Sequence, residues 1–366
     1  MQVTEPVHAL FKRASHNPSF FQVRSATKFA GPLLDFCVPV NPYFPPKEMS
    51  DRIKEHLGEI LKYYPDYADT HQEAIAAFTG LPTDCIVAAN GSTEIITSVC
   101  RDVGGPIVTP VPTFGRWTDL PIELNIPIHF IARRKERGFR IHVEEMAETV
   151  ARHKATVAVI CNPDNPTGAS MTFEEARELI LRLKHLPLLI IDESFIDFSG
   201  IQSAASLALE SSNTVIVKSM GKSLGWHGIR LGYAVANKHL AARMRKKLPY
   251  WNINGLASFV LKNLSEFRST YQASFQRIAQ DREALFNRLR PIKGLTTFPS
   301  AANFLYCELG AGHAGPTLRT RLLEEYGILA RECGNKLGST KAHLRFAVLP
   351  KPATDRLGAA LEECLG

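Results

Sequence analysis

The stretch VIVKSMGKSLGWHGIRLGY, from Val215 to Tyr233, decides the fold. It begins with an apolar, β-branched run, which is typical of a buried strand. Glycine and serine then interrupt the run, and Lys222 lies in this turn, eight residues before Arg230. Lysine is strongly hydrated and is rarely placed beside a buried sheet without a function. The stretch therefore predicts a strand that ends next to a lysine available for chemistry.

The composition is that of an ordinary globular protein, and the length of the chain suggests two domains. Of the 366 residues, 45% are hydrophobic and 22% are charged. The seven cysteines are scattered without a C-x-x-C pair, which favours a reducing compartment over a disulfide framework or a metal site. The start of the chain lacks an apolar signal segment, and no apolar run is long enough to span a membrane. We therefore expect a cytoplasmic protein without a membrane partner.

The charge pattern argues against a nucleic-acid partner. The formal net charge is +7, but the basic residues are dispersed apart from the cluster RMRKK at 243–247. Nucleic-acid binding requires a basic stripe with interleaved aromatic residues, and none is present. We interpret the cluster as a solvated helix face. The mild basicity fits an anionic small-molecule substrate equally well.

Short apolar runs alternate with amphipathic segments along most of the chain, as in FEEARELILRLKHL at 173–186. This alternation is typical of βαβ units with a largely parallel, buried sheet. The runs that predict strands are PIVTPV (106–111), IPIHFIA (126–132), TVAVIC (156–161), LPLLIID (186–192), TVIVKS (214–219) and RLGYAVA (230–236).

A second, smaller α/β unit follows a long helical pattern over residues 257–290. Its predicted strands are ANFLYCEL (302–309) and AHLRFAVL (342–349), whereas residues 1–35 show no clear period. We therefore expect a large domain over residues 36–265 and a small domain that combines residues 1–35 with residues 266–366.

Polar residues follow three of these predicted strands, at 162–168, 192–193 and 218–222, and the short apolar run CIVAA (85–89) is likewise followed by polar residues at 90–94. In parallel sheets, ligands bind at the carboxyl ends of the strands, so we expect these residues to share one edge. Taken alone, three of the signals have ordinary explanations: a helix cap, a rigid turn and a surface lysine. Asp192 is harder to dismiss, because a carboxylate after six apolar residues needs a cationic or N–H partner.

The four segments together resemble the pyridoxal-phosphate enzymes of fold type I, the class I and II aminotransferase superfamily. The resemblance rests on Ser219, Lys222, Gly228 and Arg230, with NPTG at 165–168 and Asp192, and it covers essentially the whole chain. It implies an α/β, aspartate aminotransferase-like fold, with a mostly parallel seven-stranded sheet in the large domain and a smaller α/β domain.

The spacings are most similar to the branch of histidinol-phosphate aminotransferases and threonine-phosphate decarboxylases. Asp192 follows Asn165 by 27 residues, and Lys222 follows Asp192 by 30. The segments YYPDYADTHQEAIA, DESFIDF and MRKKLPYWNINGLAS resemble the decarboxylases of this branch.

The resemblance implies a role for each residue around the cofactor, pyridoxal 5′-phosphate. Lys222 would bind the cofactor aldehyde covalently and then carry the α-proton, whereas Lys218 should lie inside the strand. Asp192 would pair with the ring nitrogen and keep it protonated, which makes the ring an electron sink. Asn165 would donate a hydrogen bond to the phenolic oxygen. The cofactor phosphate would be held by Ser92, Thr93, Ser219 and Arg230.

The resemblance also implies residues for the substrate and for a second subunit. Tyr64 matches a tyrosine that reaches the cofactor phosphate of a partner, which implies a homodimer with shared active sites. Trp117 matches the aromatic residue that stacks on the ring, with Phe114 as the alternative. Arg345 matches the arginine that binds the carboxylate of an amino-acid substrate. Arg331 would bind a second substrate anion or form a surface salt bridge.

Departures from the branch decide the ranking of activities. Phe195 replaces a tyrosine that follows the aspartate, Pro39 replaces an asparagine, and SHNPSF (15–20) replaces a His-Gly-Gly stretch; we interpret its His16 as a loop residue. The last two positions bind substrate phosphate in the decarboxylases. We therefore place an aminotransferase first, acting on an amino acid or a derived, even phosphorylated, amine. A decarboxylase, or a related lyase or cyclase, comes second, and a non-catalytic binding protein is the remote alternative.

Overall fold

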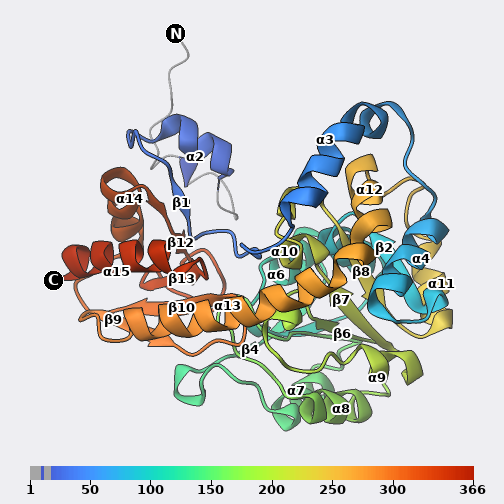
Figure 1. Ribbon diagram of the computed structural model, residues 1–366. Coiled ribbons are helices and arrows are strands. Elements are labelled where there is room, and N and C mark those ends of the chain that lie inside the picture. Colours follow the sequence, from blue (N-terminus) through green and yellow to red (C-terminus); the bar gives the residue numbers. More distant parts are fainter. Residues whose placement is uncertain (1–9, 12–17) are drawn as a thin grey trace.

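The stretch from Val215 to Tyr233 forms a strand, a turn and a returning strand around Lys222. Strand β7 (Thr214–Lys218) leads into the short helix α10 (Met220–Ser223), the 3-10 turn η4 (His227–Ile229) and strand β8 (Gly232–Val235). This structure is a computed structural model, and it describes residues 10, 11 and 18–366 (Figure 1). β8 runs antiparallel to β7, with Tyr233 opposite Lys218.

The described residues form a seven-stranded sheet in the order β2-β8-β7-β6-β5-β3-β4. β8 is antiparallel to both of its neighbours, and the other pairs are parallel, so the expected mostly parallel sheet is confirmed. The register places Asp192 between Cys161 and Val217. The remaining strands are β2 (Ile86–Ala89), β3 (Ile107–Val111), β4 (Ile128–Ala132), β5 (Val157–Cys161) and β6 (Leu188–Asp192).

Helices cover both faces of this sheet because successive strand residues point to opposite sides. Ile191 and Ile216 belong to an apolar core on one face, and Ile190, Val215 and Val217 belong to a core on the other. The first core includes α3 (Lys47–Lys62), α4 (Ala68–Thr79), α7 (Val143–Arg152), α8 (Phe173–Arg182), α9 (Ala205–Glu210) and α12 (Gly255–Leu264). The second includes α5 (Ser92–Asp102), α6 (Arg116–Glu123) and α11 (Lys238–Arg245).

A second unit, orange to red in Figure 1, has its own core around an antiparallel sheet in the order β12-β13-β10-β9. Near it, β1 (Leu34–Asp35) pairs with β11 (Ile328–Leu329), so the N-terminal segment joins the C-terminal unit. The domain boundaries themselves stay a prediction. The other elements are β9 (Leu295–Phe298), β10 (Phe304–Leu309), β12 (Arg331–Glu332), β13 (His343–Ala347), α13 (Arg268–Leu289), α14 (Gly315–Tyr326) and α15 (Lys351–Leu365).

Two segments differ from the sequence-based expectation. The long helical pattern at 257–290 is interrupted by the 3-10 turn η5 (Ser265–Phe267), which separates α12 from α13. The N-terminal segment contains helix α2 (Phe20–Ala26), although the sequence shows no clear period there. The signal for α2 is a capping box, in which Ser19 and Gln22 exchange hydrogen bonds between side chain and backbone.

The described residues contain no disulfide, no group of side chains suited to a metal ion and no membrane-spanning helix. All seven cysteines are free, and six of them are buried. Within residues 10, 11 and 18–366 no three His, Cys, Asp or Glu side chains are grouped so that they could hold a metal ion. None of the helices formed by these residues is both long enough and apolar enough to cross a membrane.

The turn after Lys222 is covered closely by the segment from Asn41 to Phe44. The Asn41 amide donates a 2.9 Å hydrogen bond to the Lys222 carbonyl, and its side chain donates one of 2.9 Å to the Ser223 carbonyl. Gly225 has a φ of +72°, and a Cβ there would overlap the carbonyl oxygen of Phe44. Only glycine fits, both in backbone conformation and in space.

We expect Gly225→Ala to destabilise the protein far more than a matched substitution at Gly200. Gly200 has the same φ of +72°, but nothing lies within 4 Å of the position that a Cβ would take there. Its substitution should cost about 1 kcal/mol for the left-handed backbone alone. Gly225→Ala should cost at least about 2 kcal/mol more, because the backbone of residues 41–44 must move. Guanidinium denaturation of both variants measures the difference, and equal losses would contradict the close approach.

Candidate active site

The residues after the parallel strands meet at a cavity of about 300 Å³ between the two units. A narrow recess of this cavity extends to Asp192 and Ser194, past Lys222. Three of the four segments predicted from the sequence border this cavity and its recess. The fourth, at 90–94, lies at the same edge of the sheet because β2 and β7 are both antiparallel to β8 and so run in the same direction. The cavity is lined by Cys37, Val38, Pro39, Phe114, Asn165, Phe195, Lys222, His227, Arg331, Lys336 and Arg345.

The Lys222 amine lies in a mostly apolar part of this cavity. Its Nζ is 4.8 Å from the centre of the Phe195 ring and 6.0 Å from that of Phe114, and the residue is 9% exposed. Burial lowers the pKa of Lys222 to about 8, the charges of Arg230 and Arg345 act in the same direction, and Asp192 opposes them. The lowered pKa makes the neutral amine, which is the nucleophilic form, more accessible near neutral pH than it is for an ordinary lysine.

Lys218, four residues earlier, lies beside two carboxylates. It is the last residue of β7, as expected, and its ammonium group lies 3.0 Å from Glu193 and 3.7 Å from Asp197. Burial alone would lower the pKa of Lys218, but these two carboxylates outweigh burial and raise it. Lys218 therefore remains a charged, structural lysine.

Asp192 is 2% exposed and is held by two donors. Its Oδ2 accepts a 2.7 Å hydrogen bond from the Trp117 indole, and its Oδ1 accepts one of 3.0 Å from the Ser194 amide. The expected ring-stacking position of Trp117 is not what the structure gives. Trp117 is buried in the core behind Asp192, where its N–H needs an acceptor. Phe114 is the aromatic residue on the cavity wall.

Asn165 and Arg345 are joined across the cavity. The Arg345 Nη1 donates a 2.6 Å hydrogen bond to the Asn165 Oδ1, and Nη2 donates one of 2.6 Å to the Cys37 carbonyl. The guanidinium also lies over the Phe304 ring, at 4.9 Å. Its geometry is therefore fixed, and the Asn165 amide nitrogen is left to donate to another acceptor.

The loop that carries Asn165 is organised by a buried carboxylate. Asp164 accepts hydrogen bonds of 2.9 Å from the Thr113 hydroxyl and of 2.7 Å from the Thr167 hydroxyl. The Arg133 guanidinium lies 3.5 Å away and balances its charge. These contacts involve neighbouring loops, so the position of Asn165 depends on the packing of the whole sheet edge.

Arg331 is buried in β12 and is not a surface residue, which removes the surface salt-bridge alternative. It is paired in register with Arg345 of β13, and its Nη2 donates a 2.7 Å hydrogen bond to Asn335. Lys336 lies on the same wall and donates a 3.1 Å hydrogen bond to the Thr113 carbonyl. Burial and then the charge of Arg331 lower the pKa of Lys336 to about 8.

Two residues of the cavity were not identified from the sequence. Lys336 lies in a glycine-bounded turn five residues after Arg331, a weak signal that many surface lysines share. His227 lines the cavity one residue before Gly228. Burial, with the charges of Lys222 and Arg230, lowers the pKa of His227 to about 3, so the imidazole is neutral.

Arg230, which directly follows η4, lies beside the start of α5 and the predicted phosphate-binding residues there. Its Nη2 donates a 3.4 Å hydrogen bond to the Thr93 hydroxyl, and Ser92, the first residue of α5, is buried. A Cβ on Gly91 would lie 2.6 Å from Arg230 Nη2, so glycine keeps this space open. A helix N-terminus with an adjacent guanidinium has the donor set that a phosphate group requires. Ser219, by contrast, lines a different cavity, beside Lys218.

Tyr64 is not brought to the cavity of its own chain. It follows α3, is 81% exposed, and its ring centre lies 4.9 Å from that of Trp251. His16, interpreted as a loop residue, lies outside the described residues.

These groups fit pyridoxal phosphate on the basis of their own chemistry. A buried, partly neutral amine suits an aldehyde, and a carboxylate in a narrow recess suits a protonated ring nitrogen. The space at Gly91, beside Arg230 and the first N–H groups of α5, suits the phosphate. A parallel sheet that ends in this set of groups defines the fold type I class of pyridoxal-phosphate enzymes.

The comparison with known proteins gives the family. The profile of the family "Aminotransferase class I and II" matches residues 32–362, and the chain belongs to this family. It is therefore a pyridoxal-phosphate-dependent enzyme.

The most similar relatives include both activities of the branch. The chain is 30% identical to the L-serine phosphate decarboxylase of Campylobacter jejuni, over 91% of this chain and 89% of the relative. It is 29% identical to the histidinol-phosphate aminotransferase of Chlorobium chlorochromatii, over 80% and 79%. The solved structure of a decarboxylase from Sulfurospirillum multivorans superposes with a TM-score of 0.90 and 25% identity, over 100% and 96% of the two chains.

We expect Lys222→Met to stabilise the cofactor-free protein in a pH-dependent way. The pKa of Lys222 is about 8, below its ordinary value of 10.5. The unfolded chain therefore binds this proton more tightly, and the penalty is fully present below pH 8 and disappears toward pH 10.5. At pH 7 the variant should be more stable by about 2 kcal/mol.

Guanidinium denaturation of the cofactor-free proteins at several pH values measures this difference. Lys184→Met, at an exposed lysine, is the control and should show no such pH dependence. A stability advantage of Lys222→Met that stays constant from pH 7 to about pH 10 would reflect packing alone and would contradict the lowered pKa.

Proposed function

We propose that this chain decarboxylates a phosphorylated amino acid, for which L-serine phosphate is the simplest candidate. The observation that carries the proposal is the charge of the cavity. Its lining residues include four cations, Lys222, Arg331, Lys336 and Arg345, and no carboxylate. Four cations without a carboxylate favour a ligand with more than one negative group.

The charges match an amino acid that also carries a phosphate. An α-carboxylate contributes one negative charge, and a phosphate ester contributes about 1.5 to 2 at neutral pH. Arg345, fixed by Asn165 and the Cys37 carbonyl, is suited to the planar carboxylate. Arg331 and Lys336, on the adjacent wall, are suited to the phosphate. An unphosphorylated amino acid would lack the second anionic group that Arg331 and Lys336 are placed to contact.

The relatives also favour the activity that we placed second from the sequence. The relatives described above include a serine phosphate decarboxylase with 30% identity and a decarboxylase structure with a TM-score of 0.90. The departure at Pro39 argues against a phosphorylated substrate when the sequence is taken alone, but Pro39 lines the same cavity as Lys336. We propose that Lys336 provides the phosphate contact that Pro39 cannot.

We propose the following residues for the cofactor. Lys222 binds its aldehyde, Asp192 pairs with the ring nitrogen, and Phe114 stacks on the ring in place of Trp117. The phosphate is held by Ser92, Thr93 and Arg230, and Ser219, which lines the cavity beside Lys218, is left out of this set. When bound, pyridoxal phosphate supplies a protonated ring that accepts the electron pair released at the α-carbon.

The residues of the chain then orient the substrate and supply a proton. Arg345 and Arg331 hold the two anionic ends, so the bond to the carboxylate can be aligned for cleavage. Cleavage of that C–C bond would release CO₂, and the bound ring would delocalise the electron pair left at the α-carbon. The ammonium form of Lys222 would donate the proton that forms the new C–H bond. The net reaction takes up one proton and yields CO₂ and a phosphorylated amine.

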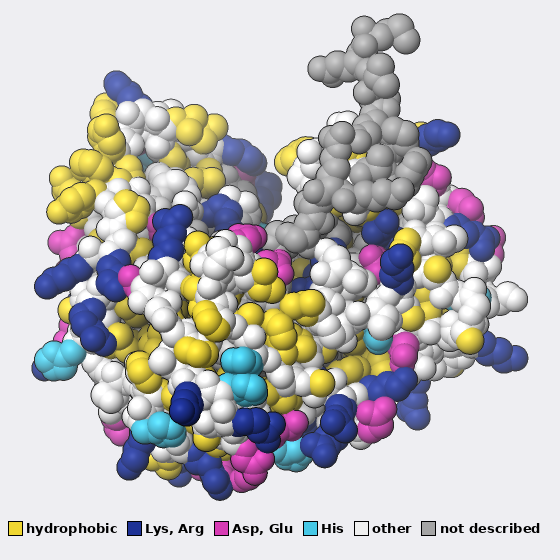
Figure 2. Space-filling view, turned by 180° about the vertical axis from the view of Figure 1, so that it is seen from behind, with side chains coloured by type: hydrophobic (Ala, Val, Ile, Leu, Met, Phe, Trp, Pro, Cys, Tyr) yellow, Lys and Arg dark blue, Asp and Glu magenta, His cyan; other side chains and the backbone are white. Residues whose placement is uncertain are grey.

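A homodimer with shared active sites is part of the proposal. Figure 2 shows hydrophobic side chains gathered on the lobe that contains α3 and the segment after it. Large apolar residues of this surface are exposed, by 81% for Tyr64, 87% for Tyr250 and 76% for Leu61. Such a patch marks an interface, and a second copy of the chain would place Tyr64 near the partner's cofactor phosphate.

The decarboxylase proposal predicts a specific product balance. The holoenzyme incubated with L-serine phosphate should release CO₂ and a phosphorylated amine in equal amounts, without any keto acid. Glutamate formation that requires 2-oxoglutarate, without CO₂, would instead support the aminotransferase. A phosphorylated amino acid should be turned over at least about tenfold more efficiently than its unphosphorylated form, as measured by kcat/KM.

Lys336→Gln should impair the reaction of the phosphorylated substrate selectively. Loss of a charged hydrogen bond to phosphate should lower kcat/KM by about 30-fold, whereas activity with the unphosphorylated amino acid should change less than about threefold. Lys341→Gln, at an exposed lysine of the same segment, is the matched control. Equal losses with both substrates would show that Lys336 does not bind the phosphate.

The proposed interface predicts an effect of Tyr250→Glu on the oligomeric state. A charge in the centre of an apolar interface should shift the protein from dimer to monomer at micromolar concentration. Phe21→Glu, at a residue that is 80% exposed on α2, should leave the dimer intact. Sedimentation velocity distinguishes these outcomes, and a Tyr250→Glu protein that remains fully dimeric would place the interface elsewhere.

A further inference from the structure

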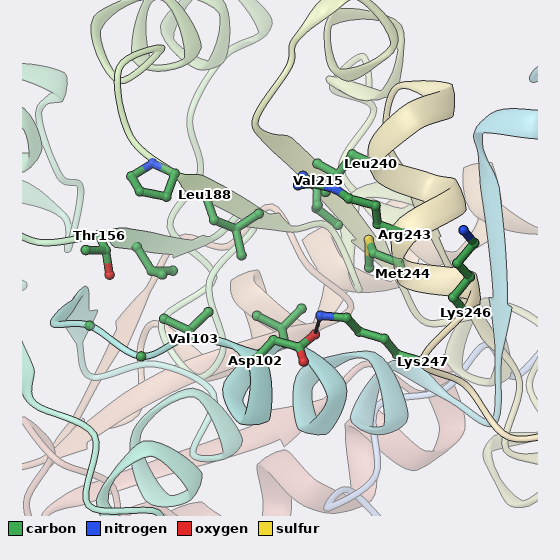
Figure 3. A pocket seen from close by; sticks show the side chains of 15 residues that line it. Asp102, Val103, Thr156, Leu188, Val215, Leu240, Arg243, Met244, Lys246 and Lys247 are labelled. Carbon is green, nitrogen blue, oxygen red and sulfur yellow. Dashed lines mark ion pairs between the residues drawn. The ribbon is translucent and has the colours of Figure 1, made fainter.

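A larger cavity lies at the opposite edge of the seven-stranded sheet from Lys222. Its volume is about 580 Å³, and it reaches the first residues of β5 and β6 and Val215 of β7 (Figure 3). The end of α5, the loop 103–105 and the end of α11 with the residues after it form its other walls. The strands are five residues long, so about 15 Å of sheet separates this cavity from the catalytic edge.

The walls of this cavity are mainly apolar, and its mouth is basic. The apolar walls are formed by Val99, Val103, Val157, Leu188, Val215, Leu240 and Met244. Arg243, Lys246 and Lys247 provide the basic mouth, and all three belong to the cluster at 243–247 that we interpreted from the sequence as a solvated helix face. Arg243, Lys246 and Lys247 are exposed, in agreement with that interpretation, and the structure also places them beside an apolar hollow, as Figure 3 shows for the labelled residues.

The positive charge at the mouth is only partly balanced. Lys247 forms a 2.5 Å ion pair with Asp102, which joins the end of α5 to the segment that follows α11. Arg243 and Lys246 form no ion pair with any residue that the structure describes. Two cations beside an apolar hollow are suited to an anionic group attached to an apolar body.

A buried polar atom in the wall also lacks a partner. The Thr156 hydroxyl, just before β5, is inaccessible to solvent and has no hydrogen bond to any described residue. Buried hydroxyl groups nearly always have a partner, so this atom is unusual, but a ligand in the cavity could reach it only if the wall moved. The apolar walls and the two cations without an ion-pair partner among the described residues are therefore the two features on which a binding site can rest.

We infer that this cavity is a binding site for an amphipathic organic anion, separate from the catalytic site. The volume is in the range of small-molecule sites, and the apolar walls exclude inorganic phosphate as a sufficient ligand. The ligand has an apolar body of about the size of a naphthalene ring or a medium acyl chain, which fills the hollow. Its negative group lies at the mouth, between Arg243 and Lys246. The inference does not depend on the proposed decarboxylation.

Isothermal titration calorimetry of the holoenzyme with 2-naphthalenesulfonate and with neutral 2-naphthol tests this inference. The naphthol tests whether the hollow binds an apolar body, and the comparison with the sulfonate tests whether the mouth binds a negative group. The wild type should bind the sulfonate at about one site per chain and at least about fivefold more tightly than the naphthol. The double variant Arg243→Ser with Lys246→Ser should weaken sulfonate binding about fivefold and leave naphthol binding within about twofold. The double variant Arg134→Ser with Lys184→Ser removes the same charge from other exposed sites and is the control.

A cavity-filling variant completes the test. Val103→Trp should weaken both ligands at least about fivefold, because the indole occupies the hollow. If its melting temperature shows that Val103→Trp does not fold, Met244→Trp replaces it. The absence of sulfonate binding to the wild type overturns the inference. Binding that is unchanged in the Arg243/Lys246 variant and in the filled variant also overturns it, because the probe then binds elsewhere.

Discussion

A surplus of buried positive charge around Lys222 is the constraint on which the rest of this structure depends. The cavity is lined by four cations, and two carboxylates at this edge of the sheet are engaged in other contacts. Asp192 accepts hydrogen bonds from Trp117 and Ser194, and Asp164 is balanced by Arg133. Because desolvation of an ammonium group is costly, Lys222 responds by losing part of its charge. Burial is the largest cause of this shift, Asp192 opposes it, and Arg230 and Arg345 add to it. The cations of the cavity also make it attractive to anions, which is the basis of the proposed choice of substrate.

The different surroundings of Lys222 and Lys218 arise because successive side chains of a strand point to opposite faces of the sheet. Successive residues at the end of β6 point in different directions, so Asp192 borders the cavity recess while Glu193 pairs with Lys218. Lys218 keeps its proton because Glu193 is 3.0 Å away, whereas Lys222 is surrounded by aromatic rings and other cations. Two lysines four residues apart thus acquire opposite protonation behaviour from one strand and the turn that follows it.

The sequence was sufficient for the fold and for the residues that end the strands, because hydrophobic runs and turn residues are local signals. Lys222, Asp192, Asn165 and Arg345 do meet at one cavity. Other features depend on contacts between distant segments and could not be predicted locally. Lys336 becomes significant only when its loop folds over Thr113, and Trp117 was placed on the ring because its motif does not show which aromatic residue is buried. The break at η5 and the basic mouth of the second cavity are tertiary features of the same kind.

The proposed covalent role of Lys222 is tested most directly by reducing the holoenzyme with borohydride and mapping the labelled peptide. Lys218, Lys222 and Lys336 are all near the sheet edge, but their environments differ, with a raised pKa only at Lys218. A stable pyridoxyl group on Lys222 alone is the predicted result. A label on Lys218 or Lys336, or no label on protein that has bound the cofactor, would contradict the assignment of Lys222 as the reactive amine.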